Sequence, residues 1–272
     1  MHDVAVAGDS TALRSVIAGT GDITIIGPLT VFEAAINGAQ LRVIGSWQPI
    51  VDYRIVAAKS AGSTLADLKN KTFASAGPSD MTTELPKMVL RKHGIDEKGL
   101  KFIQVGGHPA RLQAVVAGKV DAALINTLTS VKGESEGAVT VVSKITDDFP
   151  SFGYVSLTVK AADLSDAAKR KAFEIFLKGN VLGARYTMEH PQEAAEILQK
   201  RAPDLDLALI KRVVQELNGM KVWGLNGGND PQVLTFTSDT AFDLKMIDRK
   251  VKVEEVMDNS IQDKVLAELG KR

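Results

Sequence analysis

The chain has 272 residues, of which 44% are apolar and 24% are charged, and its 33 Lys and Arg residues balance 33 Asp and Glu residues. This composition is typical of a globular protein with one large domain or two smaller ones. A neutral chain without a basic tract is a poor candidate for nucleic-acid binding, which needs clustered cations to neutralise phosphates. The sequence contains no cysteine, which excludes disulfides, thiolate metal sites and cysteine nucleophiles.

The N-terminus shows no targeting signal. Met1-His2-Asp3 leads directly into a strand-like run at residues 4–7, without the charged segment, apolar core and cleavage site of a signal peptide. No apolar run approaches the ~20 residues that a membrane span needs. We therefore expect a cytoplasmic protein, or a mature or truncated chain.

Strand-like runs alternate with helical patterns over the first 160 residues. Helical spacing places Ile17 and Val116 on the apolar faces of two of the helices. The expected strands lie at residues 23–26, 41–44, 53–58, 72–76, 100–105, 122–125, 139–142 and 154–159. This alternation predicts an α/β fold, with parallel sheets covered by helices on both faces.

Helices dominate the chain after about residue 164. Ser165 is a candidate cap of the first of them, and Asn259 is a candidate cap of the last. Two more helices are expected to begin at Pro191 and Pro231, because proline is favoured in the first turn of a helix.

One stretch of the sequence recurs at an offset of 99 residues. Segments 13–23 and 112–122 share Leu, Val, Ala, Gly and Asp at five equivalent positions. The pattern predicts a helix that ends at a left-handed glycine, followed by a turn and a buried strand. The offset is too long for a solenoid repeat, so we interpret it as two similar α/β lobes. The alternative is chance, because helices followed by Ala-Gly and a strand are common.

Small and polar residues follow one expected strand at residues 77–83. The start of a helix offers free N–H groups and the positive end of a dipole, which favour an anionic or polar ligand group. The alternative is that Ser79 or Asp80 only caps the helix. The candidate ligand-binding residues of this segment are Gly77, Ser79, Met81, Thr82 and Thr83.

Further candidates lie at the ends of other strands, where open α/β sheets place their ligands. His108 follows two glycines and is able to donate a hydrogen bond, although this segment also reads as a plain surface loop. Gly27 and Pro28 follow the strand of the first repeat, and Asn126 follows the strand of the second. Trp47 is a candidate for the apolar wall of a pocket, or for a core residue.

The sequence carries little sign of enzyme chemistry. The four histidines are scattered without metal-ligand spacing, and no nucleophile elbow is present. The adjacent Asp147 and Asp148 are interpreted as solvated carboxylates rather than an acid/base pair. The glycine-rich stretch 223–230 lacks the ending of a phosphate loop and is interpreted as a plain loop. We expect no catalytic residue, no metal and no cofactor.

Residues 12–159 resemble the substrate-binding proteins of ABC importers for nitrate, aliphatic sulfonates, taurine and thiamine-precursor pyrimidines. The resemblance rests on the order and spacing of several segments. They are VIAGTGDI at 16–23, STLADLKNKTFA at 63–74, the turn at 77–83, the helix end KHGI at 92–95, the second repeat at 112–121, and DNS at 258–260.

This resemblance implies a periplasmic-binding-protein fold of type II, with a ligand cleft between two α/β lobes. Lobe one comprises residues 1–57 and 155–272, and lobe two comprises residues 58–154, with crossings near 53–59 and 151–159. The implied ligand-binding positions are the strand-end residues named above: Gly27, Pro28, Trp47, Gly77, Ser79, Met81, Thr82, Thr83, His108 and Asn126. Members of the family usually begin with one further strand and helix, so we expect a truncated chain whose lobe one lacks a strand.

The resemblance also implies a function. We expect a non-enzymatic periplasmic receptor, monomeric, that closes around a small organic anion and delivers it to an ABC permease in the membrane. Sulfonates, nitrate, aromatic carboxylates and pyrimidines all remain possible ligands. One alternative is a pyrimidine-synthase-like enzyme, although such enzymes use a cysteine-rich motif that is absent here. The other is a cytoplasmic ligand-sensing module that acts with a partner chain.

Overall fold

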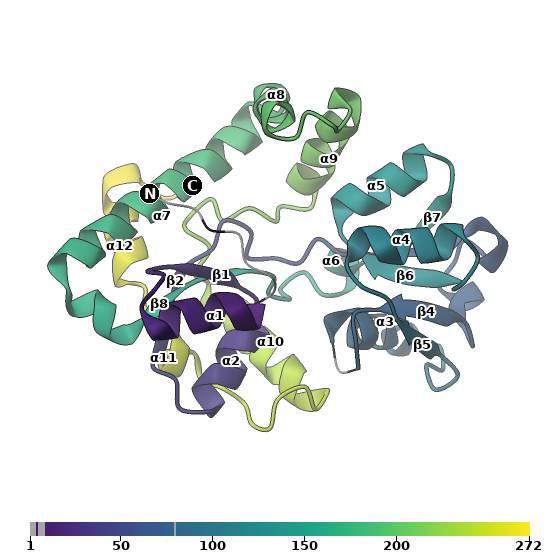
Figure 1. Ribbon diagram of the computed structural model, residues 1–272, viewed down its shortest axis with the longest axis horizontal. Coiled ribbons are helices and arrows are strands. Elements are labelled where there is room, and N and C mark those ends of the chain that lie inside the picture. The colour runs from purple at the N-terminus through teal and green to yellow at the C-terminus, as the bar shows by residue number, and fades with distance from the viewer. Residues whose placement is uncertain (1–3, 5–8, 79) are drawn as a thin grey trace. The chain divides into compact units, whose positions relative to one another are not determined.

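The computed structural model describes residues 4, 9–78 and 80–272, and it divides into two compact units (Figure 1). Unit 1 comprises Met1–Val51, Ser151–Glu189 and Val222–Arg272, and unit 2 comprises Asp52–Pro150 and His190–Lys221. Most of the strand expected at residues 4–7 lies outside the described residues, as does Ser79. Among the described helices, none is long and apolar enough to span a membrane.

In the described residues, unit 1 is built on three strands that form a sheet of order β1-β8-β2. Its strands are β1 (Thr24–Ile26), β2 (Leu41–Gly45) and the central β8 (Ser156–Lys160), which runs antiparallel to both neighbours. Its helices are α1 (Asp9–Ala18), α2 (Pro28–Ile36), α7 (Ala167–Glu189), α10 (Pro231–Asp243), α11 (Val253–Val256) and α12 (Ser260–Leu269).

Helices cover both faces of this sheet, because neighbouring strand residues point to opposite sides. Ile44 of β2 packs with Phe173 of α7 in one apolar cluster, which includes residues of α12. Val43, the preceding residue, packs with Phe32 of α2 and Leu234 of α10 in a second cluster. The two clusters together form the core of unit 1.

Unit 2 holds a five-stranded sheet of order β5-β4-β6-β3-β7. Its strands are β3 (Arg54–Ala58), β4 (Thr72–Ser75), β5 (Lys101–Gln104), β6 (Ala122–Ile125) and β7 (Val139–Lys144). Its helices are α3 (Met81–Lys92), α4 (His108–Val116), α5 (Thr127–Ser135), α6 (Ile145–Asp148), α8 (Pro191–Arg201) and α9 (Leu207–Gly219). Three short 3₁₀ turns, at Lys59–Ala61, Ala66–Leu68 and Ala161–Ser165, complete the chain.

The expectation of purely parallel sheets is wrong for two strands. β4 runs parallel to β5 and β6, but β3 is antiparallel to β6 and β7, as β8 is to its neighbours in unit 1. Both β3 and β8 are the first strands after the chain changes unit. They follow no helical crossover within their own sheet, and such a crossover is what makes neighbouring strands parallel.

The units differ from the expected lobes in the segment His190–Lys221. The expected lobe one held all of residues 155–272, whereas α8 and α9 belong to unit 2. The reason is that α9 packs on both α8 and α5, and Arg212 of α9 pairs with Glu134 of α5. The chain therefore changes unit four times, after Val51, Pro150, Glu189 and Lys221.

The internal repeat has the same local structure in both units. Gly19 and Gly118 end their helices with φ of +77° and +66°, a conformation that glycine adopts without strain. Val16 and Val115 are buried, at 0% and 1% exposed. The prediction that Ile17 and Val116 lie on buried faces is wrong, because both are about half exposed (49% and 48%).

The repeat extends further than the sequence identities indicated. Helices α2 and α5 begin and end at positions that also differ by 99 residues, and Asp9 of α1 is the position equivalent to His108, the first residue of α4. The order β1-β8-β2 in unit 1 corresponds to β6-β3-β7 in unit 2. In unit 2, β4 pairs with the other side of β6; in unit 1, no described strand pairs with the other side of β1. The missing strand that the resemblance implies for lobe one stays a prediction.

Two helix caps differ from the expected ones. Asp166, rather than Ser165, accepts hydrogen bonds from the N–H groups of the first turn of α7, at 2.8 and 3.0 Å. Asn259 makes no side-chain cap at α12, and the carboxylate of Asp258 accepts from the N–H of Ser260 at 2.8 Å. A carboxylate is favoured at both places because its charge also meets the positive end of the helix dipole.

A cluster of charges around Glu216 holds α9 on the sheet of unit 2. Nη2 of Arg54, whose side chain is 1% exposed, lies 3.0 Å from Oε2 of Glu216. Nζ of Lys144 is 3.2 Å from the same oxygen. Burial opposes ionisation of Glu216, but Arg54 and Lys144 hold the pKa of this carboxyl below its usual value. The cluster joins β3, β7 and α9 by charge-assisted hydrogen bonds.

We expect Glu216→Gln to destabilise the protein by about 3 kcal/mol, because it leaves the buried Arg54 without its counter-charge. Urea denaturation followed by circular dichroism measures the change. Glu268→Gln is the matched control, since Glu268 pairs with Lys178 at 2.7 Å on the surface, and the loss of an exposed ion pair is expected to change the stability far less. Equal effects of the two substitutions would contradict the role of Glu216.

Candidate ligand-binding site

Three helices of unit 2 begin at one edge of its sheet. The parallel strands β4, β5 and β6 end at this edge and are followed by α3, α4 and α5. The carboxyl ends of parallel strands are the usual ligand position in open α/β sheets. Six of the predicted site residues come together along this edge: Gly77, Met81, Thr82, Thr83, His108 and Asn126.

The start of α3 is capped by the chain itself. Oδ1 of Asp80 accepts hydrogen bonds from the backbone N–H of Thr82 at 2.8 Å and from its hydroxyl at 2.5 Å. The hydroxyl of Thr83 donates to the carbonyl oxygen of Gly77 at 2.7 Å. Both threonine hydroxyls therefore hold the turn in place, and the capping alternative raised by the sequence is confirmed for Asp80.

The start of α5 is also capped by side chains. Oδ1 of Asn126 accepts a hydrogen bond from the N–H of Thr129 at 3.1 Å. The buried carboxylate of Asp52 accepts from the N–H of Thr127 at 3.0 Å. A negative charge therefore already lies at this positive helix end, where a ligand anion is otherwise stabilised.

The start of α4 is different, because no described side chain caps it and its first turn contains no acidic residue. The ring of His108, the first residue of α4, lies there instead. Its Nδ1 accepts a hydrogen bond from Nη2 of Arg111 at 2.8 Å and one from the backbone N–H of Asn126 at 3.2 Å. The ring of Tyr53 meets the imidazole edge-on, with the centroids 5.0 Å apart.

Burial, and then the charge of Arg111, lower the pKa of His108 from 6.5 to about 4, although Asp80 acts in the opposite direction. His108 is therefore uncharged at neutral pH. Of the three helix ends at this edge, that of α4 combines a free positive dipole end, a neutral imidazole and a buried guanidinium.

Sequence reasoning missed Arg111. This side chain is 3% exposed, and its Nε and Nη1 donate to the carbonyl oxygens of Leu124 at 3.1 Å and Gly106 at 2.7 Å. The repeat contained the signal, because the position equivalent to Arg111 is Ala12. A charged residue on the buried face of a helix needs partners, and here they are the ends of the two strands that flank β4.

Gly27 and Pro28 follow β1 in unit 1, as predicted, and they open α2, but the N–H of Gly27 is already engaged. It donates to Oδ2 of Asp9 at 2.7 Å, and the hydroxyl of Thr30 donates to the same oxygen at 3.3 Å. This contact is the equivalent, one repeat earlier, of the bond between the N–H of Asn126 and His108. Asp9 thus supplies a carboxylate where unit 2 has an imidazole.

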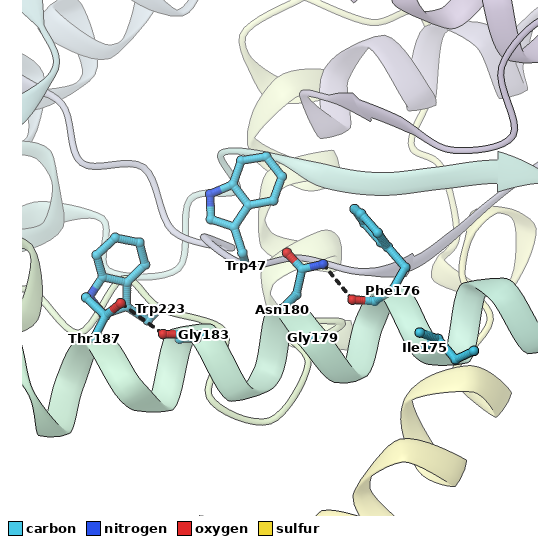
Figure 2. A pocket seen from close by; sticks show the side chains of 9 residues that line it. Trp47, Ile175, Phe176, Gly179, Asn180, Gly183, Thr187 and Trp223 are labelled. Atoms are coloured by element: carbon cyan, nitrogen blue, oxygen red, sulfur yellow. Dashed lines mark hydrogen bonds between the residues drawn. The ribbon is translucent and has the colours of Figure 1, made fainter. Parts of the chain in front are cut away.

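Trp47 lies in a separate groove of unit 1, with a volume of about 580 Å³ (Figure 2). Trp47 and Trp223 face one side of α7, and Figure 2 shows both rings beside this helix. The helix contributes Ile175, Phe176, Gly179, Asn180, Gly183, Ala184 and Thr187. The polar groups of Asn180 and Thr187 bond to carbonyl oxygens of α7 itself, so the lining is largely apolar.

The loop 223–230, interpreted from the sequence as plain, packs tightly on the segment that carries Trp47. A Cβ atom on Gly224 or Gly228 would lie 2.0 or 2.2 Å from the carbonyl oxygen of Ser46. Only glycine permits this approach. The N–H of Gly224 in turn donates to the carbonyl oxygen of Trp47 at 2.7 Å. This bond holds the backbone of Trp47 beside that of Gly224, so that Trp47 and the preceding Trp223 line the same groove.

Of the two adjacent carboxylates considered in the sequence, only Asp147 is exposed. Asp148 is not solvated as expected: its side chain is 8% exposed and lies 2.9 Å from Nε2 of His93 and 3.4 Å from Nζ of Lys92. Within the described residues, no three His, Asp or Glu side chains are placed to hold a metal ion.

Comparison with known proteins identifies the family. Residues 3–181 match the family model of the periplasmic substrate-binding protein of phosphonate ABC transporters. No curated protein sequence matches the chain. Solved structures, by contrast, resemble it over most of its length, and three of them illustrate the range.

A ligand-binding component of an ABC-type import system from Staphylococcus aureus has a TM-score of 0.75 at 11% identity, with 95% of this chain and 85% of that chain covered. The alkanesulfonate-binding protein of Xanthomonas axonopodis pv. citri, solved with MOPS, has a TM-score of 0.68 at 19% identity, with 91% and 84% covered. A Candida albicans gene product with the generic periplasmic-binding-protein fold has a TM-score of 0.64 at 14% identity, with 96% and 82% covered.

These likenesses confirm the predicted periplasmic-binding-protein fold. Identities this low show a shared fold and not a shared ligand. The family model, by contrast, matches well over half of the residues. The chain therefore belongs to the family of periplasmic substrate-binding proteins of phosphonate-type ABC transporters.

Proposed function

We propose that the protein is the solute receptor of an ABC importer, and that it binds a small organic anion of the sulfonate or phosphonate class. The observation that carries the proposal is the α4 end of the unit 2 edge. It is the one of three helix ends there without a described acidic or capping side chain, and it lies beside Arg111 and His108. A helix N-terminus of this kind favours a negative oxygen.

The surroundings of His108 support a small and specific ligand contact. The ring N–H of His108 and the free backbone N–H groups at the start of α4 are able to donate hydrogen bonds to one acceptor oxygen of a ligand. The carboxylates of Asp80 and Asp52 already accept hydrogen bonds from the helix starts of α3 and α5. The family match and the Xanthomonas protein, which is named for alkanesulfonate binding and was solved with MOPS, favour an oxyanion. The proposed contact residues at this edge are Gly77, Met81, Thr82, Thr83, His108 and Asn126, all of them in unit 2. For Ser79, which lies outside the described residues, and for Gly27, Pro28 and Trp47 of unit 1, a ligand contact stays a prediction from the sequence.

The same geometry favours binding over catalysis. A histidine acts as a general base through a nitrogen lone pair that faces the substrate. The lone pair of Nδ1 is already shared by Arg111 and Asn126. We therefore propose that the protein releases its ligand chemically unchanged. As for other receptors of this family, we propose a periplasmic location, a monomeric state and a membrane permease as the partner.

We expect saturable one-to-one binding of at least one compound among ethanesulfonate, taurine and methylphosphonate, measured by isothermal titration calorimetry, whereas binding of nitrate or benzoate alone would contradict this ligand class. At a hundred times the dissociation constant, mass action raises the stability of the folded state by about 2.7 kcal/mol, which appears as a higher melting temperature. Ethanol, which has the same carbon chain as ethanesulfonate and no anion, is the control. NMR spectra of the recovered ligand should show no product.

Two outcomes would count against the proposal. A protein that melts cooperatively and responds to none of these anions is not a receptor for this class. Conversion of a ligand into a new compound would favour the enzyme alternative.

A further inference from the structure

The two ring nitrogens of His108 have different surroundings. Nδ1 lies 2.8 Å from Nη2 of Arg111 and 3.2 Å from the backbone nitrogen of Asn126. Both neighbours are obligate donors, because a guanidinium keeps its protons and an amide nitrogen does not accept. Nδ1 must therefore be the acceptor, and the single ring proton lies on Nε2. Nε2 has no hydrogen-bond partner among the described residues.

Arg111 is itself held in one orientation. Its guanidinium donates to carbonyl oxygens at the end of β6 and just after β5, and to the His108 ring. A planar guanidinium presents its donors in a fixed fork, so the bonds to Leu124 and Gly106 direct Nη2 at Nδ1. In unit 1 the equivalent acceptor is the carboxylate of Asp9, and Ala12 occupies the position of Arg111. Both units share this backbone, but the arginine is present only in the unit whose acceptor is an imidazole.

Three charged or titratable groups from neighbouring elements act on this ring. Arg111 comes from α4, and Asp80 comes from the start of α3. Tyr53, which precedes β3, packs against the imidazole. The carboxylate of Asp52 is bonded to the N–H of Thr127 at the start of α5. Burial is the first reason why the charged ring is disfavoured, and the charge of Arg111 is the second. Protonation at Nδ1 would also place a new N–H against two existing donors.

We propose that Arg111 is a positioning residue that fixes His108 in the tautomer with its proton on Nε2. The site thereby offers the ligand a neutral hydrogen-bond donor in place of an imidazolium cation. This inference rests on the proposed function, because it concerns how the receptor meets the ligand oxygen.

The neutral state of the His108 ring affects which ligands the site recognises. A neutral donor recognises an acceptor oxygen by hydrogen bonding and leaves charge recognition to the helix end and the buried guanidinium. A sulfonate keeps the same charge between pH 5 and 8. Its affinity should therefore be constant over a range in which an ordinary histidine, with a pKa of 6.5, changes its charge.

The protonation of His108 also links stability to pH. The folded state has a pKa of about 4 and the ordinary value is 6.5, so between these values the unfolded chain binds more protons. The free energy of unfolding should therefore rise with pH through this window and fall as the pH drops towards about 4. We expect His108→Gln to have a flatter pH profile of urea denaturation than the wild-type protein. An unchanged slope would mean that the ring titrates normally.

The tautomer can be observed directly in the ligand-free protein. Long-range ¹H–¹⁵N spectra of ¹⁵N-labelled protein should show an unprotonated Nδ1 and a protonated Nε2 for His108 from about pH 5 to pH 8. Arg111→Met should give a mixture of tautomers and a higher pKa. Arg91→Met, at an exposed arginine of the same unit that pairs with Glu97, should leave the His108 signals unchanged.

Either of two spectra would overturn the proposal. One is a wild-type His108 that carries its proton on Nδ1, or is charged, at pH 7. The other is a folded Arg111→Met protein whose His108 signals match the wild type. The first measurement needs no variant, so it decides the tautomer even if Arg111→Met fails to fold.

Two substitutions of His108 test which of its two ring nitrogens contributes to ligand binding. Gln places an N–H donor near the position of Nε2, whereas Asn reaches only as far as Nδ1. We expect His108→Gln to keep the Kd for ethanesulfonate within about threefold, and His108→Asn to raise it about tenfold, the loss of one hydrogen bond. Equal losses, or a wild-type Kd that changes between pH 5 and 8, would overturn the proposal. If ethanesulfonate does not bind the wild type at all, the proposed ligand class fails, while the spectra still decide the tautomer.

Discussion

The buried guanidinium of Arg111 is the interaction on which the unit 2 edge depends. It contacts the ends of β5 and β6 and the first residue of α4, so it ties two strands and a helix to one point. A buried cation is costly unless its donors are satisfied, and here backbone carbonyls and an imidazole satisfy them. This requirement orients the His108 ring, and the other ring nitrogen has no hydrogen-bond partner among the described residues.

In both units, the helix ends that follow strands show how stability and ligand binding depend on the same positive helix dipole. A positive helix end is stabilised by a carboxylate, whether it belongs to the chain or to a ligand. Asp80 and Asp52 supply that carboxylate at α3 and α5, and Asp9 supplies it at α2. A helix end that is capped in this way has little to offer an anion, and the uncapped end of α4 becomes the exception.

The sequence was sufficient for the strands, the family resemblance and the repeat, because these depend on local patterns. All eight expected strands that lie in the described residues are present, and Gly19 and Gly118 adopt the expected left-handed turns. The direction of β3 and β8 and the place of α9 were not predictable in this way. They depend on where the chain changes unit and on contacts between residues far apart in the sequence, such as Glu216 with Arg54.

The candidate site was predictable only in part, for a related reason. His108 and Asn126 stand at strand ends and were found by position, but their contact with each other and with Arg111 appears only in the fold. Gly27 was found by the same rule, yet its N–H is occupied by Asp9, eighteen residues earlier. A strand-end position indicates where a ligand is able to bind, and the side chains around it decide whether the position is free.

The internal repeat allows occupied and unoccupied strand ends to be compared directly. Both units have the same local backbone, but they carry different side chains at the equivalent positions. In each unit the first residue of one helix accepts a hydrogen bond from the N–H that precedes the next helix. With Asp9 this contact is a complete cap that needs no further partner. With His108 the acceptor is a neutral ring with a second nitrogen, and Arg111 replaces Ala12 to hold it. The two units thus differ at two positions of one scaffold, Asp9 against His108 and Ala12 against Arg111. Only the second unit keeps a ring nitrogen without a described partner, and this is the physical reason why we propose the anion site at α4.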